Sequence, residues 1–191
     1  MLLAYASYRV KPTKIIAVVG SKKSGKTTIV ELIVKHLSSL GLKVGTLKHI
    51  HHPDFTADRE GTDTWRHRSA GAIVSSYISA REAGSFTSLK REPEALEEAL
   101  SLVKVDGLDV LVIEGFHRLV SSRADVGKVV AFKDIKDLEE RLPGTVGPII
   151  ALCTFNKKVD RERLPQNLTS VVLMDEVEVL LKRLEDFVKS P

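Results

Sequence analysis

The stretch "GSKKSGKT", residues 20–27, places four residues between Gly20 and Gly25 and follows the second glycine with lysine and threonine. Residues 14–20, "KIIAVVG", precede it as a β-branched run that predicts a strand. Residues 27–41 follow it, and their apolar residues at helical spacing, with a glycine at the end, predict a helix. At such a strand-to-helix junction, backbone N–H groups and the helix N terminus converge on phosphate oxygens. The stretch therefore predicts a phosphate-binding loop.

The pattern also predicts roles for the side chains of this loop. Lys26 should reach the terminal phosphates of a nucleotide, and the Thr27 hydroxyl should help to hold Mg²⁺. Lys22 and Lys23 add positive charge, which either contacts phosphate or faces water. The alternative is a glycine-rich turn with a solvated lysine, but the flanking strand and helix favour nucleotide binding. The predicted nucleotide-binding residues are Gly20, Ser21, Lys22, Lys23, Ser24, Gly25, Lys26, Thr27 and Thr28.

A phosphate loop needs an acidic partner for its metal, and the run "LDVLVIEG", residues 108–115, supplies Glu114. The run is almost continuously apolar, as expected of a strand buried on both faces, and Glu114 stands at its carboxyl end. Gly115 permits close approach of a ligand, which favours a metal role over that of a surface glutamate. Thr27 and Glu114 are therefore the predicted Mg²⁺ ligands. Asp109, at the opposite end of the strand, is predicted to be a turn or cap residue.

The rest of the chain alternates between strand and helix patterns. Further strands are predicted over residues 42–50, 72–79, 126–133, 148–154 and 170–174, and further helices over 64–72, 92–103 and 177–188. Asp63 is predicted to cap the first of these helices, and Pro93 to lie in the first turn of the second. Residues 51–61 have turn residues without periodicity and predict a loop. The order implies an α/β fold of the P-loop NTPase kind, with three layers and a mostly parallel central sheet.

Length and composition limit the architecture. The 191 residues, 43% of them hydrophobic, suffice for one sizeable core, so we expect a single nucleotide-binding domain over residues 1–191. The net charge of +4 arises from intermixed charges, and nothing in it demands nucleic acid. The single cysteine, Cys153, lies in an apolar run and is expected to pack as a small hydrophobe in a protein of the reducing cytoplasm. No apolar run reaches membrane-spanning length, and residues 1–10 lack a secretion signal, so we interpret them as a frayed end or an edge strand.

A second unusual segment begins at the end of the strand predicted over residues 42–50. Charged and titratable side chains gather along it: Lys48, His49, His51, His52, Asp63, Arg66, His67 and Arg68. Because the carboxyl ends of strands face the ligand crevice of an open α/β sheet, we expect this group beside the phosphate loop. As an alternative, the histidines bind a transition metal together with Asp54 and Asp58. A local ion pair is the alternative for Asp63 and His67, which are four residues apart on a helix.

Four motifs stand in a fixed order along the chain. They are "GSKKSGKTT" (residues 20–28), "LKHIHHPDF" (47–55), "EGTDTWRHRSAGA" (60–72) and "DVLVIEGFH" (109–117), and "GKVVAFK" (127–133) is a weaker fifth. In this order they resemble the MobB family, the molybdopterin-guanine dinucleotide biosynthesis adaptor proteins. The resemblance extends from about Lys14 to Lys133. The combination is specific, whereas the phosphate loop alone would not be.

The resemblance implies a homodimeric GTP-binding protein with slow hydrolysis, which assists the attachment of GMP to molybdopterin. It implies GTP and Mg²⁺ as cofactors, and molybdenum cofactor guanylyltransferase and the molybdopterin cofactor as partners. By the resemblance, Gly20, Gly25, Lys26 and Thr27 bind nucleotide phosphates, while Thr27 and Glu114 serve Mg²⁺. The partner or cofactor crevice that it implies is lined by Lys48, His49, His52, Asp63, Arg66 and Arg68.

Two features depart from the family pattern. MobB proteins commonly have lysine after the aromatic residue that follows Glu-Gly, whereas this chain has His117, whose charge depends on pH. Residues 156–160, "NKKVD", resemble the guanine-reading Asn-Lys-x-Asp of many GTPases, but the aspartate comes one residue late. In an extended segment that shift turns Asp160 to the opposite side. The residues themselves therefore leave the choice between GTP and ATP open.

Phosphoryl transfer needs positioning and charge neutralisation more than covalent chemistry. We expect Lys26, Glu114 and Asp63 to be the catalytic residues of any phosphoryl transfer. No residue is an evident positioner of an attacking water, with Asp63, His49 and Glu114 as the candidates, so slow turnover is expected, as suits a switch or an adaptor. Together with the resemblance, this implies a weak Mg²⁺-dependent GTPase. One alternative is a small-molecule kinase that turns over rapidly only with its acceptor. Another is a metal-handling protein in which a histidine loop, with His49, His51 and His52, binds a transition metal and the nucleotide gates release of that metal.

Overall fold

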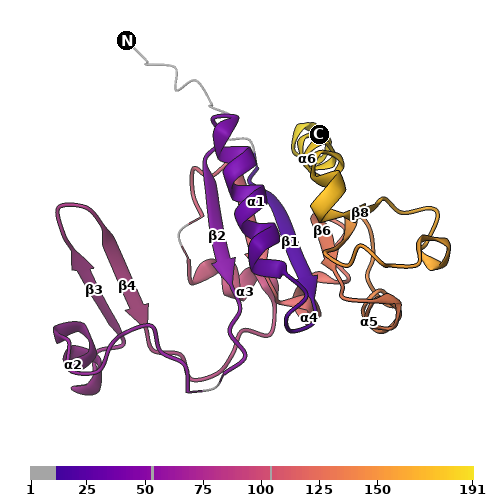
Figure 1. Ribbon diagram of the computed structural model, residues 1–191. Helices are drawn as coiled ribbons and strands as arrows, with labels where there is room; N and C mark the ends of the chain where they lie inside the picture. Colours follow the sequence, from indigo (N-terminus) through magenta and orange to yellow (C-terminus); the bar gives the residue numbers. More distant parts are fainter. Residues whose placement is uncertain (1–11, 53, 104) are drawn as a thin grey trace, which may run out of the picture. The chain divides into compact units, whose positions relative to one another are not determined.

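The structure, a computed structural model, describes residues 12–191 with the exception of residues 53 and 104 (Figure 1). The chain divides into two compact units. Unit 1 comprises the residues up to His49 together with those from Val105 onward, and unit 2 comprises the segment between them. The expectation of a frayed end or an edge strand at residues 1–10 lies outside the described residues.

A six-stranded sheet forms the centre of unit 1. Its strands are β1 (Lys14–Gly20), β2 (Val44–Lys48), β5 (Val110–Glu114), β6 (Val126–Ala131), β7 (Ile149–Thr154) and β8 (Ser170–Val172). They lie in the order β2-β5-β1-β6-β7-β8, and every pair of neighbours is parallel. The carboxyl end of β1 therefore lies between those of β5 and β6. The predicted α/β fold of the P-loop NTPase kind, with a mostly parallel central sheet, is confirmed.

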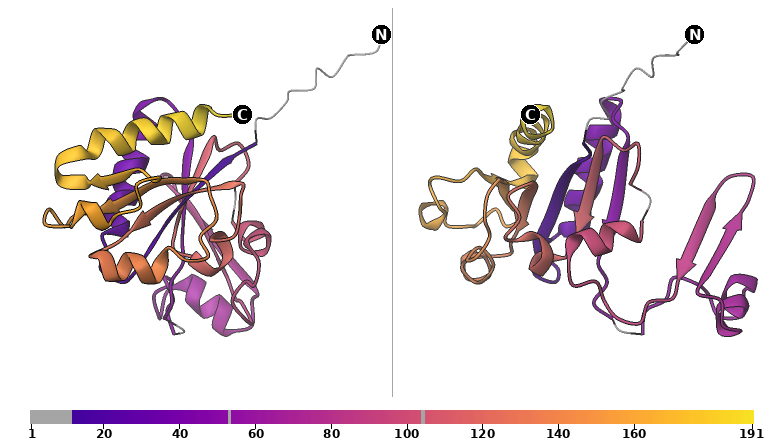
Figure 2. Two further views of the ribbon diagram at one scale, coloured as in Figure 1. Left: turned by 90° about the vertical axis from the view of Figure 1, so that its right-hand side faces the viewer. Right: turned by 180° about the vertical axis from the view of Figure 1, so that it is seen from behind.

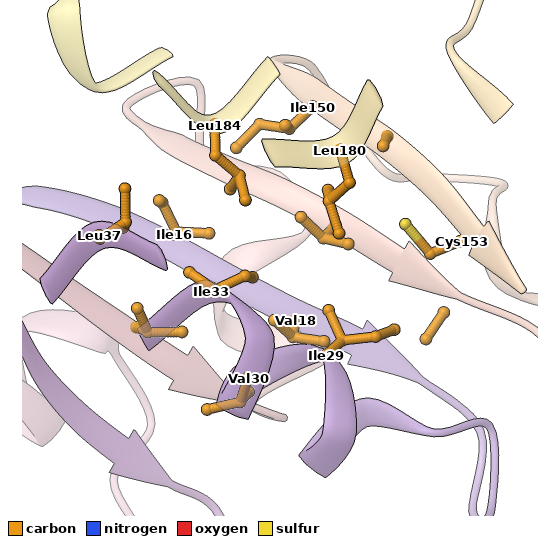
Figure 3. Packing of buried hydrophobic residues seen from close by; sticks show 14 of the residues in the cluster. Ile16, Val18, Ile29, Val30, Ile33, Leu37, Ile150, Cys153, Leu180 and Leu184 are labelled. Atoms are coloured by element: carbon orange, nitrogen blue, oxygen red, sulfur yellow. The ribbon is translucent and has the colours of Figure 1, made fainter. Parts of the chain in front are cut away.

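Two long helices cover one face of this sheet. α1 (Lys26–Ser39) and α6 (Leu173–Lys189) contact each other and lie on the same side (Figure 2). Their apolar faces meet the strands in one core, to which Ile29 of α1 and Leu180 of α6 both belong (Figure 3). Cys153 of β7 belongs to this core and is fully buried, as predicted. This packing fixes the first turn of α1 at the end of β1.

Three shorter helical segments of unit 1 have too little apolar periodicity to be predicted from the sequence. They are α4 (His117–Val120), α5 (Ile135–Arg141) and the 3-10 helix η1 (Arg161–Arg163). α5 begins after Asp134, whose side chain accepts the backbone N–H of Asp137 at 2.9 Å. Throughout the part of the chain that the structure describes, no helix is both long and apolar enough to cross a membrane.

Unit 2 contains a small antiparallel sheet and two short helices. In chain order these are α2 (Asp63–Ser69), β3 (Val74–Ile78), β4 (Ala83–Thr87) and α3 (Leu96–Ser101). The strand predicted over residues 72–79 is confirmed as β3, but it pairs with β4 and does not join the central sheet. β4, with the sequence "AGSFT", escapes prediction because small residues weaken its strand pattern.

Two predicted details of the helices in unit 2 are wrong. Thr62, and not Asp63, is the N-cap of α2, because its side chain accepts the backbone N–H of Trp65 at 3.4 Å. Asp63 lies in the first turn, where its negative charge interacts favourably with the helix dipole and stabilises the helix. Pro93 lies before α3, whose first residue is Leu96, and not in its first turn.

Candidate functional site

The predicted phosphate loop joins the end of β1 to the start of α1, and the geometry requires both of its glycines. Gly20 has a φ of 152°, and a Cβ there would lie 2.1 Å from the carbonyl oxygen of Ala131. Gly25 has a φ of 87°, and a Cβ there would lie 2.3 Å from the ring of Phe155. Gly25 is also the N-cap of α1, and as a glycine it has no side chain with which to cap the helix. The first backbone N–H groups of α1 therefore remain open to an anion.

The Lys26 ammonium lies inside the loop. Its Nζ donates a hydrogen bond of 2.6 Å to the carbonyl oxygen of Ser21. Burial lowers the pKa of Lys26, and the nearby Glu114 carboxylate opposes this effect. The positive charges of Lys48 and Arg141 lower the pKa further. Because like charges gather here, an incoming phosphate would relieve their repulsion and offer Lys26 a charged acceptor in place of the carbonyl.

Glu114 faces the loop from the end of β5. Its Oε1 accepts a hydrogen bond of 3.0 Å from the Thr27 hydroxyl and lies 2.9 Å from the Nζ of Lys48. Lys48 and Glu114 are register partners at the ends of β2 and β5, and the Lys48 Nζ is 3.5 Å from the Thr27 Oγ1. The Lys48 ammonium is thus a cation held by one hydroxyl and one carboxylate. Because Mg²⁺ takes such hard oxygen donors, Thr27 and Glu114 fit the metal that their positions suggest.

A buried carboxylate on α5, Asp137, is a site residue that sequence reasoning missed. It is 7% exposed, and its Oδ2 accepts hydrogen bonds from the Ser21 hydroxyl at 2.7 Å and from the Lys133 backbone N–H at 3.0 Å. The available signal is Asp134, a helix-capping residue three positions earlier in the sequence. Asp137 ties the phosphate loop to α5.

A cavity of about 400 Å³ opens beside the phosphate loop. Residues of the loop and of the segments after β6 and β7 line it: Lys23, Ser24, Gly25, Thr28, Phe132, Lys133, Thr154, Phe155 and Asn156. Asn156 bridges two of these segments, since its Nδ2 donates to the Lys133 carbonyl at 3.2 Å and its Oδ1 accepts the Lys158 backbone N–H at 2.9 Å. Asp160 instead caps η1 by accepting the Glu162 backbone N–H. The cavity combines aromatic side chains with polar groups, as a nucleoside requires.

The six residues expected to line a partner or cofactor crevice are divided between the two units. Lys48 and His49 belong to unit 1, where the His49 ring stacks on that of Phe116 with 4.3 Å between centroids. The remaining four belong to unit 2, and they are His52, Asp63, Arg66 and Arg68. Their gathering into one crevice stays a prediction.

Within unit 2, Arg68 has a structural partner. Its guanidinium lies 2.9 Å from the Asp58 carboxylate, which is 3% exposed. Burial raises the pKa of Asp58, but hydrogen bonds from Thr64, Thr62 and Arg68 outweigh it and lower the pKa below its ordinary value. Arg66 is exposed, and its Nη1 lies 3.8 Å from the Asp63 carboxylate. Of the two arginines, Arg66 is therefore the one whose charge faces water.

His117 is the first residue of α4 and stands where the family that the chain resembles commonly has lysine. Burial lowers its pKa, and the positive charge of Arg141 lowers it further. One ring nitrogen, Nε2, lies 3.2 Å from the Thr145 hydroxyl. The neutral ring is therefore favoured near neutral pH, and the fixed charge of a lysine is lost.

The histidine loop gives no support to a transition-metal site. Among the described residues, no group of three or more His, Cys, Asp or Glu side chains is arranged to hold a metal ion. His51 and His52 are exposed, and the Asp58 carboxylate is engaged by Arg68. The metal-handling alternative is left without a structural observation in its favour.

Comparison with known proteins identifies relatives over most of the chain. The profile of the family described as "Molybdopterin guanine dinucleotide synthesis protein B" (MobB) matches residues 15–153. A Methanocaldococcus jannaschii protein is 33% identical over 143 residues, which are 75% of this chain and 57% of that protein. A Bacillus subtilis protein is 36% identical over 131 residues, 68% of this chain and 71% of its own length. Both are named for an adapter role in molybdopterin-guanine dinucleotide biosynthesis.

A solved structure also matches this fold. The crystal structure of Bacillus subtilis MobB superposes with a TM-score of 0.71 and 30% sequence identity. The match covers 93% of this chain and 99% of that one. The likeness therefore includes both units and is not limited to the phosphate loop.

Proposed function

The chain belongs to the MobB family, that of molybdopterin guanine dinucleotide synthesis protein B, and on this premise we propose that it is a GTP-binding adaptor. In this role it assists a guanylyltransferase in attaching GMP to molybdopterin, and its own hydrolysis of GTP is slow. The observation that carries the proposal is the convergence of Lys26, Thr27 and Glu114 at the carboxyl edge of the sheet, where Glu114 accepts the Thr27 hydroxyl at 3.0 Å.

The phosphates of GTP would lie along residues 20–28. The open N–H groups at the start of α1 would donate to them, and Lys26 would exchange the Ser21 carbonyl for a phosphate oxygen. The cavity of about 400 Å³ would receive the nucleoside, with Phe155 against the base and Asn156 at its edge. Because Asp160 caps η1 instead of lining this cavity, guanine selection would rest on Asn156 and backbone groups.

Mg²⁺ would be held by Thr27 and Glu114, and when bound it neutralises phosphate charge and orients the triphosphate. Lys48 must leave Glu114 before the carboxylate can turn to the metal, since its Nζ lies 2.9 Å from Oε1. Among the candidates for positioning a water, Glu114 is already engaged and the His49 ring stacks on Phe116. This arrangement supports slow turnover, which suits a protein whose nucleotide state is read by a partner.

The wider proposal concerns partners and setting. We expect the protein to be a cytoplasmic homodimer. Within each chain, we expect unit 1 and unit 2 to belong to a single nucleotide-binding domain. Arg66, with an exposed guanidinium, is the best placed of the predicted crevice residues in unit 2 to contact an acidic partner or the phosphate of molybdopterin. The catalytic contribution assigned to Asp63, an exposed residue of α2, stays a prediction.

A reconstituted reaction tests this function. Purified guanylyltransferase, molybdopterin and Mg²⁺-GTP are incubated with the unaltered protein, with Lys26→Ala or with Lys35→Ala, an exposed lysine of α1 that serves as the control. The unaltered protein and the control should increase the yield of molybdopterin guanine dinucleotide, measured by chromatography, and Lys26→Ala should not. Equal yields with and without the protein would contradict the adaptor role.

A further inference from the structure

Arg141 is an arginine beside the phosphate loop, and its positive charge is only weakly paired with a carboxylate. It is the last residue of α5, and its side chain is 43% exposed. Its Nε is buried and has no hydrogen-bond partner among the described residues. The nearest carboxylate is that of Asp137, one helical turn earlier, with 3.9 Å between Nε and Oδ1. This distance is too long for a hydrogen bond, so the guanidinium is available to another acceptor.

Asp137 links Arg141 to the phosphate loop. While its Oδ1 faces Arg141, its buried Oδ2 accepts the Ser21 hydroxyl at 2.7 Å. The carbonyl of Ser21 in turn accepts the Lys26 ammonium at 2.6 Å. These contacts connect the last turn of α5 with the lysine that is expected to reach the terminal phosphates. Arg141 is therefore carried by an element that is attached to the loop, and not by a free surface segment.

The electrostatics of the site point the same way. Lys26 and Arg141 lie at the two ends of this chain of contacts, with Ser21 and Asp137 between them. The Asp137 carboxylate offsets part of their positive charge. A site that gathers two cations around one buried carboxylate, with the Arg141 Nε lacking a hydrogen-bond partner among the described residues, is suited to a multiply charged anion.

We infer that Arg141 binds the terminal phosphate of a nucleoside triphosphate held by residues 20–28, and that Asp137 positions it there. The inference rests on the proposed function, since it requires a nucleotide on this loop. The guanidinium presents several N–H donors in a plane, which matches two phosphate oxygens at once. A diphosphate lacks the group that Arg141 contacts. Arg141 thus lets the protein distinguish the triphosphate from the diphosphate.

The test compares the affinities of two probes, GTPγS and GDP, each with Mg²⁺, by calorimetry. Arg141→Gln removes the charge, Arg141→Lys keeps it without the planar donors, and Arg183→Gln, at an exposed position on α6, is the matched control. Loss of a charge-assisted phosphate contact should weaken GTPγS binding to Arg141→Gln by about tenfold or more. GDP binding should change by less than about twofold. Arg141→Lys should fall between the two, and Arg183→Gln should match the unaltered protein.

The positioning role of Asp137 has its own variant. Asp137→Asn keeps an oxygen for the Ser21 hydroxyl but removes the negative charge beside Arg141. It should reduce the ratio of GTPγS to GDP affinity, an effect that loss of stability alone would not produce because both probes would then weaken together.

Other outcomes overturn the inference. If GTPγS and GDP weaken equally in Arg141→Gln, the residue supports the fold and not the terminal phosphate. If neither weakens, Arg141 does not contact the nucleotide. Failure of the unaltered protein to bind either probe would instead refute the nucleotide-binding function, and the role of Arg141 with it.

Discussion

Replacing Lys48 with methionine should strengthen the binding of the divalent metal. In the structure, the Lys48 ammonium lies 2.9 Å from the Glu114 Oε1 and 3.5 Å from the Thr27 hydroxyl, the two groups expected to serve Mg²⁺. The metal and the ammonium cannot share this position. Methionine keeps an unbranched side chain of similar length and removes the competing charge. The bound metal should then no longer have to displace a resident cation.

The exposure of the two side chains sets the size of this effect. The Lys48 side chain is 54% exposed and that of Glu114 is 12% exposed, so water screens the pair from one side only. Exposed ion pairs stabilise a protein by about 0.2–1 kcal/mol. Because the Glu114 carboxylate is the more buried partner, we expect this pair to contribute about 1 kcal/mol. Because the metal must break the pair, the substitution should strengthen metal binding by about fivefold.

The assay measures free Mn²⁺, an EPR-visible substitute for Mg²⁺, in titrations of protein saturated with GDP. Lys43→Met is the matched control, since Lys43 is an exposed lysine just before the same strand. Lys48→Met should bind Mn²⁺ more tightly than the unaltered protein, and Lys43→Met should not. Raised salt should narrow the difference because it screens the pair in the unaltered protein. If Lys48→Met binds Mn²⁺ equally or more weakly, Lys48 does not compete with the metal.

Three further substitutions test the core, the pH response and the loop. Leu180→Ala, at a fully buried site in the core, should lower the free energy of unfolding in urea by about 2–5 kcal/mol, and no measurable loss would contradict the packing in Figure 3. The folded state depresses the pKa of His117, so the unfolded state binds its proton more readily and stability should fall as pH drops below the ordinary value of 6.5. His117→Asn should therefore lose less stability between about pH 7.5 and about pH 5.5, measured as urea midpoints, and an identical loss would refute this contribution. Gly25→Ala should weaken GTP binding in calorimetry, because its φ of 87° is strained for alanine and the new Cβ would press on the cavity-lining Phe155, whereas unchanged affinity would show that the loop tolerates the change.

Features encoded by neighbouring residues could be predicted from the sequence. The phosphate loop needs only a strand, two glycines and a helix within residues 14–41, and all of them form where the pattern places them. Glu114 follows from a short apolar run whose end must lie at the carboxyl edge of a parallel sheet. The family resemblance indicated that these separate motifs belong to one site.

Features that depend on distant contacts could not be predicted. Asp137 meets Ser21 across 116 positions of sequence, and nothing near either residue announces the other. The pairing of β3 with β4 in a separate sheet depends on which strand edges are free, and strand patterns do not carry that information. Arg141 gains its significance only from the tertiary placement of α5 beside the loop.

A calorimetric titration of the metal-free protein with Mg²⁺ plus GTP or ATP, repeated with Lys26→Ala, tests whether residues 20–28 hold the nucleotide. A charged hydrogen bond contributes about 1.5–3 kcal/mol, so the loss of the Lys26 contact should weaken GTP binding at least about tenfold. We predict that GTP binds in preference to ATP and that Lys26→Ala loses this binding. Equal affinity of the unaltered protein and Lys26→Ala for GTP would contradict the claim that residues 20–28 hold the nucleotide.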